Sequence, residues 1–167
     1  MIVWLNGTFG AGKTTTATKL VSLLPSARLF DPEMVGFMLR HVLHEPVADF
    51  QDQPPWRALV RATATQVLRH VGGILVAPQT VLVEAYAREI FGGLAEDGVS
   101  MRHFVLHADT DELLRRINGS PEATQWRLDH VQPYLDAIPW LHRDATVVDT
   151  THRTPDEVAL VIKGHLD

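Results

Sequence analysis

The chain has 167 residues, of which 46% are hydrophobic and 21% charged, with a formal net charge of -5 at pH 7 and no cysteine. This length fits one domain with a buried core, and the composition excludes a disordered or fibrous chain. The acidic balance argues against a general nucleic-acid or anionic-membrane binder, and the lack of cysteine excludes disulfides and thiolate metal sites.

Apolar segments typical of strands alternate with amphipathic helical segments from one end of the chain to the other. Strands are expected at residues 2–6, 27–30, 74–77, 102–107 and 145–149. The longer helices between them are expected at about 13–24, 31–44, 56–71 and 85–96. This alternation predicts a three-layer α/β/α sandwich around a five-stranded parallel sheet of order 2-3-1-4-5. We expect residues 1–167 to form a single domain, with a lid segment near 118–137.

Polar residues at the expected helix starts predict where several helices begin. Asp31 is expected to act as N-cap with Pro32 at the first helical position. Asp109 to Glu112 has the spacing of a capping box, and Ser120-Pro121 is expected to cap the following helix. Thr154 to Glu157 has the same spacing before the last helix.

The first strand leads directly into a phosphate-binding motif. Residues 7–14 read Gly-Thr-Phe-Gly-Ala-Gly-Lys-Thr, which satisfies the P-loop signature between a strand and a helix. Its glycines let successive N–H groups turn around phosphate oxygens, and the following helix adds its positive dipole end. Lys13 is expected to reach the β and γ phosphates of ATP, and the Thr14 hydroxyl to bind Mg²⁺. The expected nucleotide-binding residues are Gly7, Thr8, Phe9, Gly10, Ala11, Gly12, Lys13, Thr14 and Thr15.

The rest of the sequence narrows the class of P-loop protein. A GTPase is disfavoured because neither Asn-Lys-x-Asp nor Asp-x-x-Gly occurs in the chain. A motor or transporter ATPase is disfavoured because the strand 74–77 continues into Pro-Gln without a carboxylate. Asp109 and Asp149 follow other strands, but helix capping and turn chemistry explain them equally well. Asp31 is the preferred carboxylate, either as base for an acceptor hydroxyl or as a Mg²⁺ ligand through water, and it also fits the role of N-cap.

Blocks of residues along the chain resemble the tunicamycin-resistance protein family. These blocks are Asn6-Gly7-x-Phe9-Gly10-x-Gly12-Lys13-Thr14, Asp31-Pro32-Glu33-x-x-Gly36-Phe37-x-Leu39-Arg40, Trp56-Arg57-Ala58 and Pro78-x-Thr80. The resemblance implies a P-loop fold of the nucleoside and shikimate kinase type, similar also to chloramphenicol phosphotransferases. It implies that Asp31 is a catalytic base and that Arg116 is a catalytic arginine at the start of the lid.

Several candidates for the acceptor site also fit a purely structural role. The resemblance implies that Arg40, Trp56 and Arg57 belong to the acceptor site, and the expected acceptor-binding residues are Asp31, Phe37, Arg40, Trp56, Arg57 and Gln79. Phe37 lies in an apolar row with Met34 and Met38 that more often belongs to a core, and Arg40 is equally well a surface charge. Trp56 either stacks on a planar ring or anchors its helix. Arg127 is the one basic residue between positions 118 and 130, and it does not align with a basic position of the family.

The function that follows is ATP-dependent phosphoryl transfer to a hydroxyl of a small, nucleoside-like antibiotic such as tunicamycin. The sparse lid leaves open a protein that binds and sequesters the drug without chemistry, and a metabolic kinase of a nucleoside or cofactor precursor is a third option. We expect a small-molecule acceptor, no nucleic-acid partner, no integral membrane segment and a cytoplasmic location. The sequence leaves a homodimer open.

Overall fold

Five parallel strands form one sheet in the computed structural model, which describes residues 1–44, 47–121 and 124–166. The strands are β1 (Ile2–Asn6), β2 (Ala27–Leu29), β3 (Ile74–Pro78), β4 (Met101–His107) and β5 (Thr146–Asp149). Their order is β2-β3-β1-β4-β5, as predicted, and every neighbouring pair is parallel. The first strand is therefore the central one.

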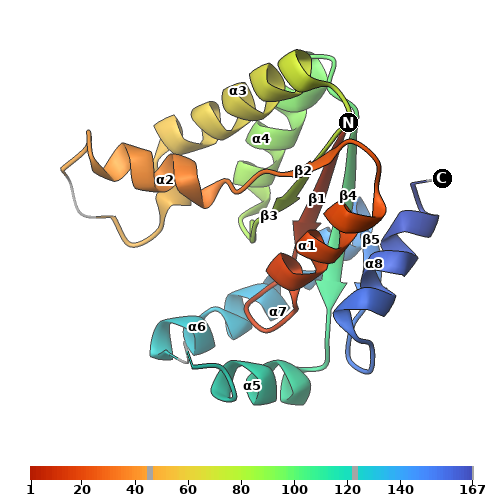
Figure 1. Cartoon of the computed structure of the whole chain (residues 1–167). Helices are drawn as coiled ribbons and strands as arrows, with labels where there is room; N and C mark the ends of the chain where they lie inside the picture. The colour runs from red at the N-terminus through yellow and green to blue at the C-terminus, as the bar shows by residue number, and fades with distance from the viewer. Residues whose placement is uncertain (45–46, 122–123, 167) are drawn as a thin grey trace.

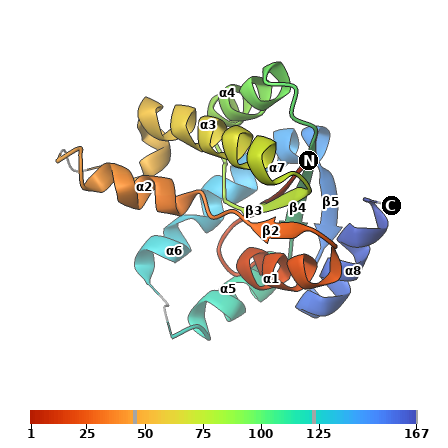
Figure 2. The same ribbon diagram turned by 45° about the horizontal axis from the view of Figure 1, so that its top comes forward.

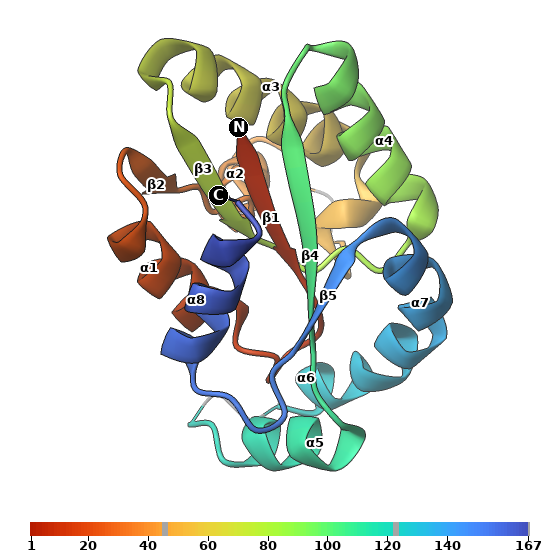
Figure 3. The same cartoon turned by 90° about the vertical axis from the view of Figure 1, so that its right-hand side faces the viewer.

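Helices cover both faces of this sheet. Within the described residues they are α1 (Lys13–Leu23), α2 (Glu33–Arg40), the 3-10 turn η1 (Phe50–Asp52), α3 (Pro54–Val71), α4 (Glu84–Glu96), α5 (Thr110–Asn118), α6 (Gln125–Asp129), α7 (Val131–Asp144) and α8 (Pro155–Gly164). Helices α1 and α8 lie together on one face, and α3 and α4 lie together on the other (Figures 1 and 3). The predicted three-layer architecture is confirmed.

The core runs along both faces of β1. Ile2, Val3, Trp4 and Leu5 are all fully buried, because a central parallel strand has helices on each side of it. The buried indole N–H of Trp4 has a hydrogen-bond partner, because its Nε1 donates to the carbonyl oxygen of Gln79 at 3.0 Å. This bond links the central strand to the segment that follows β3.

Two helix starts differ from the sequence prediction. The Asp109 side chain makes no capping bond to α5, and the Glu112 carboxylate is paired with Arg115 and Arg116 on its own helix instead of accepting from the Asp109 N–H, which donates to the Thr151 hydroxyl. The cap of α6 is Thr124, whose hydroxyl accepts from the Arg127 N–H, and not Ser120. The capping box from Thr154 to Glu157 is present at the start of α8, as predicted.

The second helix begins close to its predicted start. The N-cap position is Pro32 and not Asp31 as predicted, but the Asp31 carboxylate still caps the first turn, because it accepts from the Glu33 N–H at 2.9 Å. The helix ends at Arg40 and projects away from the sheet (Figures 1 and 2). No described helix has the length and apolar character that crossing a bilayer requires.

Candidate functional site

The loop between β1 and α1 adopts the backbone conformation that its glycines permit. Gly10 and Gly12 have φ angles of 79° and 89°. Gly7 has a φ of 130°, and a Cβ atom there would lie 2.5 Å from the carbonyl oxygen of Leu106 on β4. The loop therefore packs too tightly against β4 to accept a side chain at position 7.

The start of α1 is suited to binding an anion. Gly12 occupies the N-cap, no side chain caps the helix, and its first turn contains no acidic residue. The first N–H groups of a helix have no partner within it, and together they carry the positive end of the helix dipole. The geometry therefore fits the phosphate groups of a nucleotide.

Lys13 is held over the same loop. Its Nζ donates to the carbonyl oxygen of Thr8 at 2.9 Å and lies 5.6 Å from the ring centre of Phe9. The pKa of Lys13 is lowered to about 8, mainly by burial, while the charge of Glu33 opposes this shift and the charge of Arg127 contributes to it. An ammonium group in this position gains most from a polyanionic ligand, which would replace the water that it has lost.

A cavity of about 770 Å³ opens beside this loop, at the carboxyl ends of β1 and β3. The residues that line it are Thr8, Phe9, Gly10, Gly12, Lys13, Thr14, Thr15, Asp31, Glu33, Phe37, Arg40, Ala48, Asp49, Phe50, Gln51, Pro78, Gln79, Thr80, Arg116, Ile117, Ser120, Trp126, Arg127 and His130. The cavity thus brings together the motif, Asp31, Phe37, Arg40, Gln79, Arg116 and Arg127 from the sequence analysis. In open α/β folds, ligands bind at the carboxyl ends of the strands, beside the point where the strand order reverses.

Three carboxylates line the cavity together with Lys13. Asp31 and Glu33 come from the start of α2, and Asp49 precedes η1. Burial and the neighbouring charge of Asp31 raise the pKa of Glu33. Thr14 is exposed and lines the same cavity as Asp31, so the ligand atoms available to a Mg²⁺ ion are oxygens, which that ion prefers.

An aromatic and cationic wall continues from these carboxylates. Phe37 and Phe50 meet edge to face at 5.5 Å, and the guanidinium of Arg40 lies 4.2 Å from the ring centre of Phe50. Phe37, Met34 and Met38 are exposed, which corrects the expectation that this row belongs to the core. Arg40 is a cavity residue held against aromatic rings.

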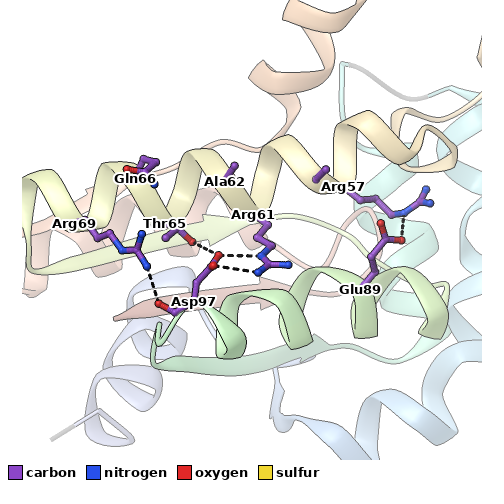
Figure 4. A pocket seen from close by; sticks show the side chains of 9 residues that line it. Arg57, Arg61, Ala62, Thr65, Gln66, Arg69, Glu89 and Asp97 are labelled. Carbon is purple, nitrogen blue, oxygen red and sulfur yellow. Dashed lines mark hydrogen bonds and ion pairs between the residues drawn. The ribbon is translucent and has the colours of Figure 1, made fainter.

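Trp56 and Arg57 do not line this cavity, contrary to the acceptor-site expectation. Trp56 is fully buried and its Nε1 donates to the carbonyl oxygen of Pro32 at 3.1 Å, so it anchors α3 beneath α2. Arg57 faces α4, where its Nε donates to Glu89 at 2.6 Å (Figure 4). Its Nη1 donates to the carbonyl oxygen of Gln51 at 2.5 Å. Arg57 therefore supports a residue of the cavity wall without lining the cavity itself.

Arg116 connects the nucleotide loop to the loop after β5. Its Nη1 donates to the Gly10 carbonyl oxygen and the Thr150 hydroxyl, both at 3.2 Å, and its Nη2 donates to the Thr150 carbonyl oxygen at 2.6 Å. Its Nε is paired with Glu112 at 2.7 Å. The arginine borders the cavity, but most of its donors bind protein oxygens.

A second hollow of about 390 Å³ lies on the far side of Arg116. Its walls are the glycine loop, the start of α1, α5 and the loop from Thr150 to Pro155. Gly10 and Gly12 of the phosphate loop line this hollow as well as the cavity. A nucleotide whose phosphates lie at α1 therefore has room in the hollow for its base.

The segment expected to form a lid contacts the P-loop through Phe9. The Phe9 ring packs edge to face on Trp126 at 4.9 Å and on His130 at 5.4 Å. The Thr8 hydroxyl donates to the His130 carbonyl oxygen at 3.1 Å, and the Arg127 guanidinium lies 5.3 Å from the Phe9 ring centre. Arg127 thus reaches the phosphate side of the cavity, which its spacing in the sequence did not indicate.

Sequence reasoning missed Thr80 and Gln51. The Thr80 hydroxyl donates to the carbonyl oxygen of Gly7 at 2.7 Å and so fixes the first P-loop glycine. Thr80 could have been found from the Pro78-x-Thr80 block, which resembles the family. Gln51 lies in a connecting segment without periodicity, so no sequence pattern indicated it.

Comparisons with known proteins agree with this geometry. A family model described as an AAA domain matches residues 3–133. The tunicamycin resistance protein of Deinococcus radiodurans is 29% identical over 99% of this chain and 94% of that chain, with a TM-score of 0.83. A comparison with curated protein sequences gives no significant match.

Two kinases share the fold at lower identity. A sugar kinase from a Janibacter species is 19% identical, with a TM-score of 0.68 over 99% of this chain and 94% of that chain. The APS kinase CysC of Mycobacterium tuberculosis, solved with AMPPNP and APS, is 16% identical, with a TM-score of 0.66 over 99% of this chain and 96% of that chain. The resemblance to the tunicamycin-resistance family is confirmed, and the two kinases show that this chain shares their fold.

Proposed function

This chain belongs to the AAA domain family of P-loop proteins, and from that premise we propose that it transfers the γ phosphoryl group of ATP to a hydroxyl of a small molecule such as tunicamycin. The observation that carries the proposal is the single cavity in which the phosphate loop, Lys13 and Asp31 meet. The name of the Deinococcus radiodurans protein supports tunicamycin as the first acceptor to test.

The nucleotide would bind across the glycine loop. The uncapped start of α1 and Lys13 would hold its phosphates, and the hollow bordered by Arg116 and the Thr150–Pro155 loop would receive the base. Thr14 and, through water, Asp31 would hold Mg²⁺, which neutralises phosphate charge when bound.

The acceptor would occupy the opposite half of the cavity. Asp31 uses its Oδ1 to cap α2, which fixes the carboxylate and leaves Oδ2 to orient an acceptor hydroxyl or take its proton. Lys13 and Arg127 stand on the phosphate side, where positive charge stabilises the group in transfer. We propose that residues 118–137 act as the lid that carries Arg127.

A binding protein without chemistry is the second candidate. The segment after β3 reads Gln79-Thr80-Val81 and supplies no carboxylate for Mg²⁺, which favours this alternative. The two candidates differ in product, because only a kinase yields an acceptor heavier by one phosphoryl group and a molecule of ADP.

The test is mass spectrometry of tunicamycin after incubation with the protein, ATP and Mg²⁺. We expect a phosphorylated product from the wild type and none from Lys13→Ala. Asp31→Asn keeps a side-chain oxygen that can cap α2 but removes the charge, so we expect it to bind ATP and to lose at least a hundredfold in turnover. A wild type that binds both ligands and never yields product would overturn the kinase in favour of the binding protein.

A further inference from the structure

Two buried glutamine side chains on the cavity wall have carbonyl oxygens without a hydrogen-bond partner among the described residues. They are Gln51 in η1 and Gln79 after β3, which are 8% and 7% exposed. Both line the cavity that the phosphate loop and Asp31 also line. A buried carbonyl without a partner is costly in a folded protein, so each one requires an explanation.

The orientation of both amides is fixed by their nitrogen atoms. Gln79 Nε2 donates to the Thr80 carbonyl oxygen at 3.1 Å, and Gln51 Nε2 donates to Asp49 Oδ2 at 3.3 Å. Turning either amide around would bring two oxygen atoms together. The unpartnered atom is therefore the oxygen in each case.

The backbones that carry these side chains are also held. The Gln51 N–H donates to Asp49 Oδ1 at 3.0 Å, while its carbonyl oxygen accepts from Arg57. The Gln79 N–H donates to the Leu5 carbonyl oxygen at 3.1 Å, and its own carbonyl oxygen accepts from Trp4. Both oxygens are thus positioned before any ligand arrives, which reduces the entropy lost on binding.

The charges around the two carbonyls define the ligand further. Asp31, Glu33 and Asp49 line this half of the cavity, and Arg40 lies against Phe50. Carbonyl oxygens and carboxylates both repel an anion and attract hydrogen-bond donors. Directly at the two carbonyl oxygens, a phosphate or carboxylate of the acceptor would therefore be disfavoured, while hydroxyl or amide N–H groups would be bound.

We propose that Gln51 and Gln79 determine acceptor specificity by accepting hydrogen bonds from two donor groups of an uncharged, hydroxyl-bearing acceptor. This rests on the proposed function, because it assigns the acceptor half of the same cavity. It distinguishes a nucleoside or glycoside, which offers several donors, from a nucleoside monophosphate or another anionic acceptor.

The test is calorimetric titration of the full chain, saturated with AMPPNP and Mg²⁺, with tunicamycin, uridine and uridine 5′-monophosphate. We expect the wild type to bind at least one uncharged probe and to bind uridine more tightly than its monophosphate. Gln51→Met and Gln79→Met should each weaken the uncharged probe about tenfold and leave AMPPNP binding within twofold. Gln66→Met, at an exposed glutamine of α3 outside the cavity, should change neither.

The results of these titrations can contradict the role of the two glutamines and the proposed kinase activity independently of each other. Unchanged probe binding in both cavity variants, tighter binding of the monophosphate, or no binding of any uncharged probe would overturn the proposal. A wild type that binds AMPPNP and probe, with the glutamine dependence but without any phosphorylated product, would overturn only the kinase. If a methionine variant does not fold, 2′,3′-dideoxyuridine tests the wild type, and affinity equal to that of uridine would contradict donor recognition.

Discussion

Asn6 and Val81 are joined by two hydrogen bonds that fasten the start of the P-loop to the segment after β3. Asn6 Nδ2 donates to the Val81 carbonyl oxygen at 2.8 Å, and the Val81 N–H donates to Asn6 Oδ1 at 2.9 Å. The same Oδ1 accepts from the Gly7 N–H at 2.8 Å. One buried amide therefore aligns the nucleotide half of the cavity with the segment that carries Gln79.

Asn6→Leu should lower the free energy of unfolding by about 2 to 4 kcal/mol. The change leaves the N–H groups of Gly7 and Val81 and the Val81 carbonyl oxygen without their partner in a fully buried setting. Urea denaturation measures the effect. Asn118→Leu, at an exposed position of α5, is the control and should stay within about 0.5 kcal/mol. A loss below about 1 kcal/mol for Asn6→Leu would contradict the anchoring role.

His103 should make the protein less stable as the pH falls from 6.5 to 4. Burial lowers the pKa of His103 from 6.5 to about 4, although Asp144 opposes the shift, and its Nε2 lies 3.3 Å from Asn6 Nδ2. Below pH 6.5 the unfolded chain binds a proton that the folded chain refuses, so unfolding becomes more favourable. The full effect is roughly 3 kcal/mol at pH 4.

Denaturation at several pH values measures the slope of the free energy of unfolding against pH. His103→Gln should flatten it between pH 6.5 and 4.5, while His152→Gln, at an exposed site, should leave it unchanged. The carboxylates of Asp97 and Glu112 have pKa values lowered to about 2, so their loss of stabilisation comes mainly below pH 4. A slope that survives His103→Gln would assign the effect to another group.

The parts of this protein that local chemistry specifies could be predicted from the sequence. The P-loop follows from glycines and a lysine in fixed spacing, and the parallel sheet with helices on both faces follows from the alternation of apolar strands with helices. The Thr154 capping box formed because Glu157 has no competing partner on its helix. Glu112 has the same spacing after Asp109, but Arg115 and Arg116 bind its carboxylate instead.

The acceptor half of the site could be predicted only in part. Trp56 and Phe37 are both aromatic residues on amphipathic helices, and nothing in their spacing tells which faces the core. The structure buries Trp56 and exposes Phe37 to the cavity. Gln51 was missed because its position depends on a contact with Arg57 that forms only when α3 packs on the preceding segment.

Arg116→Lys should weaken ATP binding about tenfold and lower the free energy of unfolding by about 2 kcal/mol. A lysine has one nitrogen and cannot bridge the oxygens of Gly10, Thr150 and Thr151 that the guanidinium reaches together. Arg115→Lys is a matched control, because Arg115 shares the Glu112 partner but is exposed. Calorimetry and urea denaturation should show at most about 0.5 kcal/mol for the control. Equal effects for the two variants would remove the bridging role.

Arg57→Met should weaken acceptor binding without weakening ATP binding. Arg57 is buried, its guanidinium lies 4.3 Å from the Tyr86 ring centre, and it holds the Gln51 carbonyl oxygen from outside the cavity. Loss of the guanidinium frees η1, so the Gln51 side chain is no longer positioned, while the P-loop has no contact with Arg57. Methionine retains much of the side-chain packing, and we expect a loss of about 2 to 4 kcal/mol in the free energy of unfolding.

Titration of the Arg57→Met variant with tunicamycin should show about tenfold weaker binding at unchanged AMPPNP affinity. The control is Arg88→Met, which removes an exposed ion pair on α4 and should leave both affinities unchanged. An equal loss for both ligands would mean that Arg57 stabilises the whole fold and not the acceptor half of the cavity.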